Sequence, residues 1–503
     1  MSSLKEKIVK VYAKYTVWKT KKWSKYPIKT QDKVFKRLIS KAKNTRFGKD
    51  HSFSEIHSKE DFSKNVPIRD YEKIKTYINL IIDGETNVLW PGRPIYFAKT
   101  SGTTSGEKHI PISKESMPYH IRGSIDATMH YINETSNTRF LNKKVIFLQG
   151  SPELEEKNSI KTGRLSGIVA HYTPSFLKNN TMPSWEANCI EDWEQKVLEI
   201  AKETLKEDMA VIGGIPPWVI MYFEQLKTLS GEKTIKDIFP NFNLFVYGGV
   251  NFSPYRDSFK KLIGKKIDSI EYYPASEGFF AYQDTQKDDA LLLQLNSGIF
   301  YEFVELDEMK KKRPKRLTIK DVVKNKNYVL IISTNAGLWA YNTGDTVSFV
   351  SLKPYKILVT GRYKHFISAF GEHVIGSEVE RALKQSLEEI NLIVKEFTVA
   401  PNITPTKGLP YHEWWVEFEE DPSEKESIKL CKKIDEKLQE QNTYYKDLVQ
   451  GKVLKHLELV IVKKGGFQKY MDGAGKLGGQ NKLPRLSNDR KIVDGLKKYI
   501  KRI

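Results

Sequence analysis

The chain has 503 residues, which is more than one hydrophobic core usually supports, so we expect two or more domains. Hydrophobic residues make up 39% of the chain and the formal net charge is +20, which indicates a folded, basic protein and excludes a largely disordered one. The only two cysteines, Cys189 and Cys431, are far apart in the sequence. They exclude a disulfide framework and a cysteine zinc site, and they predict a reducing compartment.

The N-terminal segment, residues 1–23, carries charges throughout and lacks the apolar region of a signal peptide. No stretch of the chain has the roughly 20 apolar residues that span a bilayer, so we expect a soluble, cytoplasmic protein. Residues 1–90 read as helical. A basic amphipathic helix can lie on a membrane surface, but we favour a first helix that packs on the body through Val9, Tyr12 and Trp18, with no membrane partner.

From Pro94 the pattern changes to alternating strands and helices, which predicts a largely parallel sheet with ligands at its strand ends. Strands are expected at 143–150, 242–249 and 267–278, and a helix at 193–207. Antiparallel strands follow. After Arg362 the pattern becomes that of a compact α+β unit of about 140 residues, large enough to form its own domain.

The stretch SGTTSGEKHIPIS, which starts at Ser101, concentrates small polar residues between two apolar segments. It is not a Walker loop, because Glu107 precedes Lys108 and the following Pro111 lies among β-branched residues that favour a strand. We therefore predict a strand, a loop and a second strand. Glycine allows backbone N–H groups to surround a phosphate, and the hydroxyls add donors, although an ordinary turn uses the same residues.

Three further motifs follow in the chain. YYPASEGFF places Glu277 at the end of a strand, AYNTGDTVSF places Asp345 in a glycine turn, and VTGRYKHFISAFGEHV places Arg362 after another. Each motif alone has an ordinary structural interpretation, such as a β-turn aspartate or a surface arginine. Their joint occurrence in this order is much harder to explain by these ordinary structural roles.

In this order the motifs resemble those of the adenylate-forming superfamily, which includes firefly luciferase and acyl-CoA synthetases. Within it, SGTTSGEKHIPIS, YYPASEGFF, NSGIFYEFVELDEM and GGQNKLPRLS are most similar to the auxin-responsive Gretchen Hagen family of acyl-acid–amido synthetases. The resemblance implies an α/β, firefly-luciferase-like fold. It further implies a large N-terminal domain (1–361) of mixed sheets flanked by helices, and a small, mobile α+β C-terminal domain (362–503).

The resemblance also implies ATP and Mg²⁺ as cofactors and assigns roles to individual residues. A carboxylic acid attacks the α-phosphate, and the acyl group then passes to an amine, which we expect to be an amino acid. Two anions must meet in the first step, so cations have to neutralise them. The implied contacts are the phosphates with Ser101, Gly102, Thr103, Thr104 and Ser105; adenine with Tyr273; the α-phosphate with Ser276; Mg²⁺ with Glu277; ribose with Asp345; ribose or phosphate with Arg362; the nucleotide and acyl pocket with Gly249; and the substrate carboxylate with Lys482.

Several alternatives stay open. Lys476 lies six residues before Lys482 and competes for its role, and FGEHVIGSEVE leaves a CoA thiol as an alternative acceptor. A basic nucleic-acid-binding protein is a further alternative, but the lysines are dispersed and no nucleic-acid signature is present, so no nucleic-acid partner is expected. The acid is also open: the segments 117–129, 215–223 and 246–252 contain Trp218 and Tyr222, consistent with an aromatic or medium-length acid. The sequence predicts no oligomeric state or pathway.

Overall fold

The computed structural model describes residues 2–103, 106–172, 179–249, 252, 256–362, 366–367, 369–370, 372, 374–390, 392–473, 483 and 485–501. The chain divides into two compact units. The large unit holds residues 1–100, 108–190 and 196–363, and the small unit holds residues 101–107, 191–195 and 364–503. Among the described residues, no helix combines the length and the apolar character needed to cross a bilayer.

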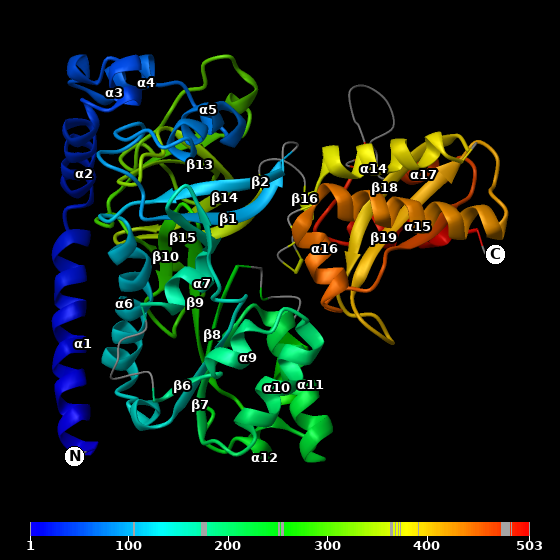
Figure 1. Cartoon of the computed structure of the whole chain (residues 1–503), viewed down its shortest axis with the longest axis horizontal. Helices are drawn as coiled ribbons and strands as arrows, with labels where there is room; N and C mark the ends of the chain where they lie inside the picture. Colours follow the sequence, from blue (N-terminus) through cyan, green and yellow to red (C-terminus); the bar gives the residue numbers. More distant parts are fainter. Residues whose placement is uncertain are drawn as a thin grey trace. The chain divides into compact units, whose positions relative to one another are not determined.

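Helices dominate the described residues up to Ile82, where α5 ends, so the helical prediction for residues 1–90 is confirmed except over its last eight residues (Figure 1). Local capping explains where these helices begin: α2 has Pro27 at its first position, Ser58 forms a capping box with Asp61, and the Asp70 side chain accepts from the N–H of Lys73. The elements are α1 (Ser2–Ser24), α2 (Pro27–Ala42), α3 (Arg46–Asp50), η1 (Phe53–Glu55), α4 (Lys59–Asn65) and α5 (Tyr71–Ile82).

Helix α1 packs on α6 (Met117–Thr135) through a different face from the one predicted. Its buried residues are Ala13, Thr16, Val17 and Thr20, whereas the side chains expected to be buried, Tyr12 and Trp18, are 48% and 56% exposed. Of the predicted face only Val9 is partly buried. The sequence prediction was wrong because small residues, which let two helices approach closely, line the contact in place of large aromatic ones.

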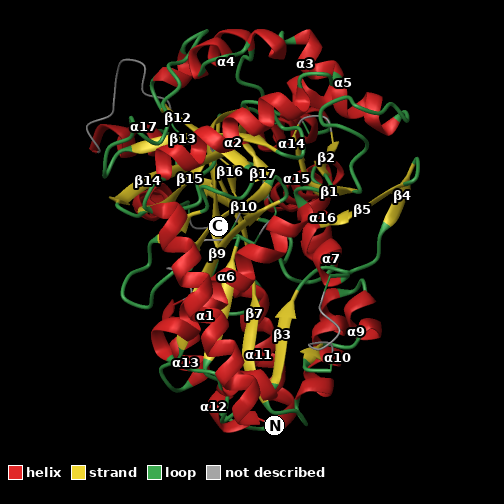
Figure 2. Ribbon diagram, turned by 90° about the vertical axis from the view of Figure 1, so that its left-hand side faces the viewer, coloured by secondary structure: helices red, strands yellow, loops and turns green. Residues whose placement is uncertain are grey.

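A sheet of eleven strands runs through the described part of the large unit, in the order β12-β13-β14-β15-β11-β10-β9-β8-β7-β3-β6. Its parallel half, predicted from the alternating pattern, pairs β9, β8, β7, β3 and β6, and Figure 2 shows β7 and β3 side by side. The other half is antiparallel. The strands are β3 (Lys144–Leu148), β6 (Thr181–Met182), β7 (Met209–Gly214), β8 (Leu244–Gly248), β9 (Asp268–Ala275), β10 (Gly278–Gln283), β11 (Leu291–Leu293), β12 (Ile299–Glu305), β13 (Asn327–Thr334), β14 (Tyr341–Leu352) and β15 (Tyr355–Arg362).

Helices cover this sheet, and α6 lies directly against β9 and β10. Gly123 allows this close packing, because a Cβ there would lie 2.3 Å from the Phe279 ring. The helix α11 begins at Pro216 and ends before Gly231, whose φ of 76° is a left-handed cap. The helical elements after α6 are η2 (Arg139–Asn142), α7 (Leu165–Ala170), α9 (Trp185–Cys189), α10 (Trp193–Thr204), α11 (Pro216–Ser230), α12 (Ile235–Ile238), α13 (Arg256–Ile263) and η4 (Glu308–Lys310).

The predicted strand–loop–strand is confirmed. β1 (Tyr96–Thr103) and β2 (Gly106–Ile112) are neighbours in a four-stranded sheet of order β2-β1-β5-β4. β5 (Ile160–Arg164) runs parallel to β1, and β4 (Glu155–Lys157) runs antiparallel to β5. The Walker alternative, which needs a helix after the loop, is thereby excluded.

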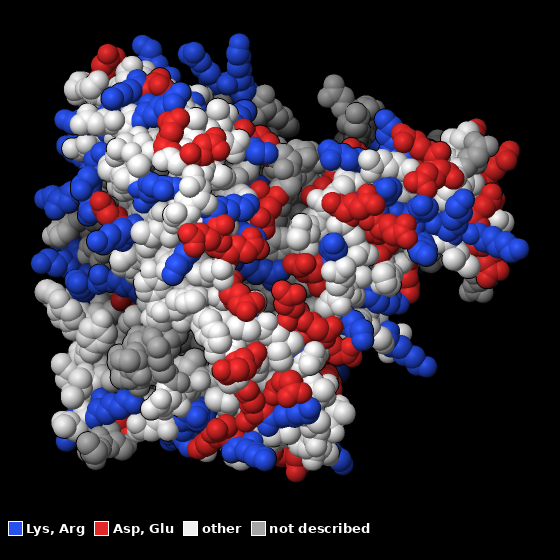
Figure 3. Space-filling view, viewed as in Figure 1, with Lys and Arg blue, Asp and Glu red and all other residues white. Residues whose placement is uncertain are grey.

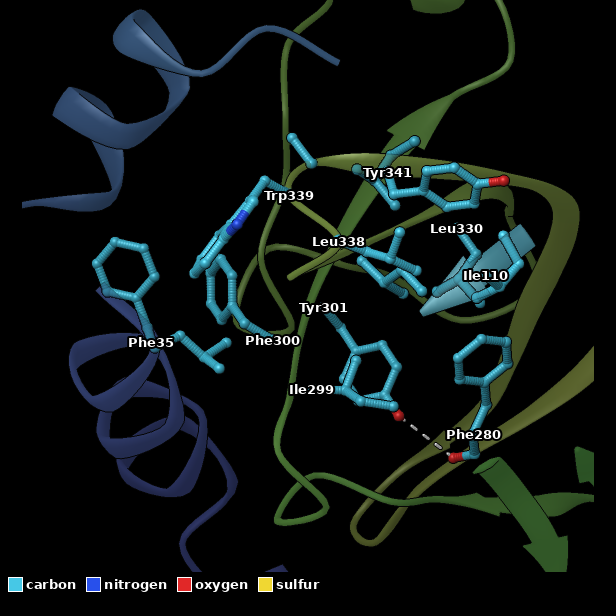
Figure 4. Packing of buried hydrophobic residues seen from close by; sticks show 14 of the residues in the cluster. Phe35, Ile110, Phe280, Ile299, Phe300, Tyr301, Leu330, Leu338, Trp339 and Tyr341 are labelled. Carbon is cyan, nitrogen blue, oxygen red and sulfur yellow. Dashed lines mark hydrogen bonds between the residues drawn. The ribbon is translucent and has the colours of Figure 1, made fainter. Parts of the chain in front are cut away.

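Aromatic side chains fill the core between α2 and the antiparallel strands (Figure 4). Phe35 of α2 packs on Phe300 of β12 with ring centroids 4.9 Å apart, and the indole N–H of Trp339 donates to the Leu89 carbonyl. The buried amide of Gln31 joins α2 to β12: it donates to the carbonyls of Leu295 and Ile299 and accepts from the Tyr301 N–H. Every polar group of this junction thus has a partner.

The end of the chain forms the α+β unit that the sequence predicts. Its three-stranded sheet has the order β18-β19-β20, with β19 and β20 parallel, and buries Trp414 and Trp415. A capping box of Ser423 and Glu426 starts α15. The elements are β16 (Phe366–Ile367), β17 (Val374–Ile375), α14 (Gly376–Glu388), β18 (Val394–Asn402), β19 (Tyr411–Phe418), α15 (Glu424–Gln441), α16 (Thr443–Gln450), β20 (Glu458–Val462), α17 (Gly466–Gly473), α18 (Lys491–Leu496) and η5 (Lys497–Tyr499).

Candidate active site

A hydrogen bond joins two of the predicted site residues. The Tyr273 hydroxyl on β9 donates to Asp345 Oδ2 on β14 over 2.6 Å, and the two residues are only 9% and 8% exposed. Tyr273 points to the side of the sheet opposite to its neighbour Tyr272, which packs under α6 and donates to the Ser124 carbonyl. A buried carboxylate needs donors, so this bond fixes where Asp345 lies.

An irregularity within β14 orients Asp345, which was expected in a glycine turn between two strands. Gly344 has a φ of 84°, and its N–H donates to Asn342 Oδ1 over 2.8 Å. The N–H of Asp345 donates to Thr343 Oγ1 over 3.1 Å. The sequence analysis did not assign roles to Asn342 and Thr343, although polar residues before a glycine are a recognisable signal of a side-chain-supported turn.

Arg362 lies directly opposite Asp345 in the antiparallel ladder of β14 and β15. Its side chain is outside the described residues, so the structure places only its backbone. Directly opposite residues of an antiparallel pair have Cβ atoms about 5 Å apart, which brings the positions of this predicted carboxylate and cation together.

The end of β9 brings Ser276 and Glu277 to the same region. Ala275 pairs with Gly278, so these two residues form the tight turn between β9 and β10, where both are half-buried. β8 runs parallel to β9, and its last residue pairs with Tyr272. Gly249 follows with a φ of 84°. The predicted residues Gly249, Tyr273, Ser276, Glu277 and Asp345 therefore gather around the carboxyl ends of β8 and β9.

Other predicted site residues lie wholly or partly outside the described residues. Ser101, Gly102 and Thr103 continue β1, but their side chains are not described, and Thr104 and Ser105 lie outside the described residues, as does Lys482. The segment after Lys482 is anchored to β18: Leu483 is buried, and Val399 exchanges backbone hydrogen bonds with Arg485 and Ser487. Lys482 comes immediately before this anchored segment in the sequence.

A half-buried carboxyl that the sequence analysis missed lies on the same strand as Tyr273. Glu271 accepts a hydrogen bond from the Tyr247 hydroxyl over 3.3 Å, and burial raises the pKa of Glu271 to about 7. Because alternate residues of a strand share a face, Glu271 lies on the Tyr273 side of β9. No chemical signature marked it in the sequence, since one glutamate in a strand is usually at the surface.

The described residues contain no group of three or more histidine, cysteine, aspartate or glutamate side chains that could hold a metal ion. A dedicated all-protein metal cage is therefore absent from that part of the chain. Mg²⁺ ordinarily binds through one or two carboxylates together with substrate phosphates and water. A single carboxylate at the β9–β10 turn fits that mode.

Part of the expected acid pocket belongs to the core. Tyr222 of α11 is completely buried, and its hydroxyl lies 2.6 Å from Thr204 Oγ1. Its ring packs beside Phe223. Tyr222 therefore holds α11 against α10, and it does not line a ligand pocket as its position in the sequence suggested.

Comparison with known proteins places this geometry in a family. The chain matches the GH3 family N-terminal domain over residues 18–188 and 153–267, the central domain over residues 292–362 and the C-terminal domain over residues 377–491. It is 22% identical to the indole-3-acetic acid-amido synthetase GH3.3 of Arabidopsis thaliana, covering 92% of this chain and 90% of that protein. It is 23% identical to the jasmonoyl–L-amino acid synthetase JAR4 of Nicotiana attenuata, covering 91% and 90%.

Solved structures share the fold. AtGH3.15, an acyl acid amido synthetase in complex with 2,4-DB, has a TM-score of 0.62 at 16% identity and covers 97% of this chain and 96% of its own. A 2-hydroxyisobutyryl-CoA ligase has a TM-score of 0.57 at 13% identity and covers 99% and 92%. The predicted adenylate-forming fold and the predicted resemblance are confirmed. The chain belongs to the GH3 family.

Proposed function

We propose that this chain is an ATP-dependent acyl-acid amido synthetase. It is an enzyme that joins a carboxylic acid to an amino acid through an acyl adenylate. Family membership over most of the chain and the amido synthetases that it resembles support this activity. The structural observation that carries the assignment is the Tyr273–Asp345 pair at the strand ends where α/β sheets bind ligands.

The nucleotide assignment follows from the chemistry of these groups. An ionised carboxylate has acceptor sites for several donors, so the Asp345 carboxylate, which accepts from Tyr273, is of the kind that also accepts from the two vicinal hydroxyls of ribose. The turn at Ser276 and Glu277 is close in sequence to Tyr273, within reach of phosphates bound at the same strand ends. The backbone of Gly249 leaves room beside it for a planar base. ATP binding by these residues is our proposal.

The reaction has two balanced steps. A carboxylate oxygen of the acid bonds to the α-phosphorus, and the bond to pyrophosphate breaks. The amino group then bonds to the acyl carbon, AMP leaves with the electron pair of the C–O bond, and the amine loses a proton. The first step joins two anions, and we assign the neutralisation of their charge to Lys482 and Arg362. Mg²⁺, held by Glu277, would supply further charge neutralisation on the phosphates.

Pyrophosphate release tests the proposal. ATP and Mg²⁺ are offered with a panel of carboxylic acids, each without acceptor, with mixed amino acids and with CoA. We expect acid-dependent release that amino acids accelerate, and we expect Asp345→Asn to abolish it without changing the melting temperature. Acceleration by CoA alone would contradict the amido transfer, and ATP binding without any turnover would contradict the enzyme assignment. We further propose that the chain divides into a large domain of residues 1–361 and a small domain of residues 362–503.

A further inference from the structure

Helix α1 has two opposite faces with different surroundings. One face packs on α6 through the small residues Ala13, Thr16, Val17 and Thr20. The other face exposes large apolar and aromatic side chains at intervals of three or four residues, each between 48% and 67% exposed. We call this face the outer stripe; its residues are Leu4, Ile8, Val11, Tyr12, Tyr15 and Trp18.

The outer stripe is not covered by the rest of the large unit. α1 forms an outer edge of that unit, and no described element of it lies beyond the helix (Figure 1). Single exposed apolar residues are common, but a contiguous row along a helix of 23 residues, about 35 Å long, marks an interaction surface. A helix packed on only one side usually carries polar residues on the other. The stripe therefore needs a partner.

Lysines border the outer stripe. The helix contains seven lysines and one acidic residue, Glu6, which accepts from the Thr138 hydroxyl at the packed side. Successive residues are about 100° apart around a helix, so Lys7 and Lys14 follow one border of the stripe and Lys19 lies on the other. Figure 3 shows lysine and arginine side chains gathered over the end of α1 and the start of α2.

The cations also lie next to the aromatic rings. Lys19 Nζ lies 5.7 Å from the centroid of the Tyr15 ring, and Lys22 Nζ lies 5.3 Å from that of Trp18. Within the described part of the chain, no α1 lysine lies at ion-pair distance from a carboxylate. Lys5 donates to the Leu141 carbonyl, and the charge of the other α1 lysines is available to an anionic partner.

We propose that the outer stripe of α1 binds an anionic membrane surface, with the helix lying in the plane of the interface. Leu4, Ile8 and Val11 would enter the boundary between headgroups and acyl chains, and the tyrosines and Trp18 would lie at headgroup level, where aromatic side chains with a polar edge are favoured. The lysines would contact lipid phosphates, and their long stems allow this while their charges stay in water.

Other occupants fit the same surface less well. A nucleic acid would attract the lysines but would leave Leu4, Ile8 and Val11 in water. A second copy of the chain would place two rows of lysines against each other across a symmetric interface, and like charges there are costly. A lipid surface satisfies both the apolar row and its cationic borders. This partner departs from the expectation that the chain has no membrane partner.

The test is flotation of the full chain with vesicles of phosphatidylcholine mixed with phosphatidylserine, compared with vesicles of phosphatidylcholine alone. Three variants are compared with the wild type. Ile8→Glu with Val11→Glu places charge in the stripe, and Lys7→Gln with Lys14→Gln removes charge from its border. The matched control is Ile428→Glu, because Ile428 on α15 is 64% exposed and lies outside the stripe. Acid-dependent pyrophosphate release verifies that each variant is folded.

We expect the wild type and the Ile428 variant to float with the anionic vesicles and to be released by salt. The Ile8/Val11 variant should not float, and the lysine variant should bind roughly tenfold more weakly. Equal flotation of the Ile8/Val11 variant and the wild type would overturn the proposal, as would no flotation of the wild type at low salt. A wild-type dimer in analytical ultracentrifugation that Ile8→Glu with Val11→Glu dissociates would overturn it in favour of a second copy.

Discussion

The phenol of Tyr273 donates a hydrogen bond to Asp345 Oδ2 over 2.6 Å, and this contact joins two strands whose contributing residues are 72 positions apart. Neither strand pairs with the other in the sheet, since β15, β11 and β10 lie between them. The bond therefore joins strands that are not neighbours in the sheet and holds the Asp345 carboxylate of β14 in place beside Tyr273, near the end of β9. We expect ATP binding to depend on it.

Tyr273→Phe should raise the KM for ATP about tenfold or more, because a hydrogen bond to a charged group contributes about 1.5–3 kcal/mol and its loss leaves Asp345 misplaced. The measurement is pyrophosphate release at varied ATP. Tyr301→Phe is the matched control, since it also removes a buried hydroxyl, which lies 3.5 Å from the Phe280 carbonyl, and Tyr301 is not among the proposed ATP contacts. An equal change in KM for both variants would mean that the Tyr273 hydroxyl acts on stability alone.

Glu277→Gln should lower the rate of adenylation about a hundredfold or more and leave the melting temperature unchanged, because the carboxylate lies half-buried in a two-residue turn and not in the core. Raising the Mg²⁺ concentration should restore part of the activity. Glu305→Gln serves as control, as its carboxylate forms a half-exposed ion pair with Lys326. A loss of stability in the Glu277 variant would instead assign this carboxylate a structural role.

Lys482→Ala should abolish acid-dependent pyrophosphate release and retain ATP binding, because a lysine that bridges the acid and the α-phosphate acts only in the chemical step. Its neighbour Leu483 is buried and the following residues are bonded to β18, so the chain next to Lys482 has a fixed attachment. Lys476→Ala is the control and should keep near-normal turnover. If the Lys476 variant alone loses activity, Lys476 and not Lys482 bridges the acid and the α-phosphate.

The fold was predictable because its signals are local. Alternating apolar segments gave the parallel strands β3, β7, β8 and β9, and proline with β-branched residues gave the hairpin of β1 and β2. The turn that carries Glu277 between β9 and β10 follows from the same patterns. Asp345, in contrast, was expected in a glycine turn between strands but lies inside β14, where the pairing with β13 is irregular.

What the sequence could not give depends on contacts between distant residues. The bond between Tyr273 and Asp345 requires the order of strands in the sheet, which no local pattern encodes. Large aromatic side chains normally pack inward, so Trp18 was expected to be buried, but the face of α1 that packs on α6 carries Ala13, Thr16, Val17 and Thr20, and Trp18 is 56% exposed. Tyr222 was expected to line a pocket because its segment lies between the elements predicted to bind the acid. No local pattern showed that its hydroxyl lies beside Thr204 inside the core.

Gln31→Leu should destabilise the large unit by about 3 kcal/mol, because it leaves the Leu295 and Ile299 carbonyls and the Tyr301 N–H buried without this partner. Thermal unfolding followed by circular dichroism measures the loss. Gln450→Leu, at an exposed glutamine that ends α16, is the control and should shift the transition little. If Gln31→Leu leaves the free energy of unfolding unchanged, the hydrogen bonds of the Gln31 amide are not needed for stability.

Glu271 should make the stability of the large unit depend on pH. Burial raises its pKa from the ordinary 4.5 to about 7, so the folded state keeps a proton that the unfolded state releases. The unfolded chain therefore binds fewer protons between these values, and the free energy of unfolding falls as pH rises from about 5 to about 7, by up to about 3 kcal/mol, and levels off above that.

Glu271→Gln removes this titration while it keeps a side chain of similar shape that can accept from the Tyr247 hydroxyl. The wild type loses stability as the pH rises, and the variant should not. The melting temperature of the variant minus that of the wild type should therefore increase steadily from about pH 5 to about pH 8. Glu305→Gln, with its half-exposed ion pair, should show no such trend. A difference independent of pH would mean that Glu271 ionises normally in the folded protein and that water reaches it beside Tyr247.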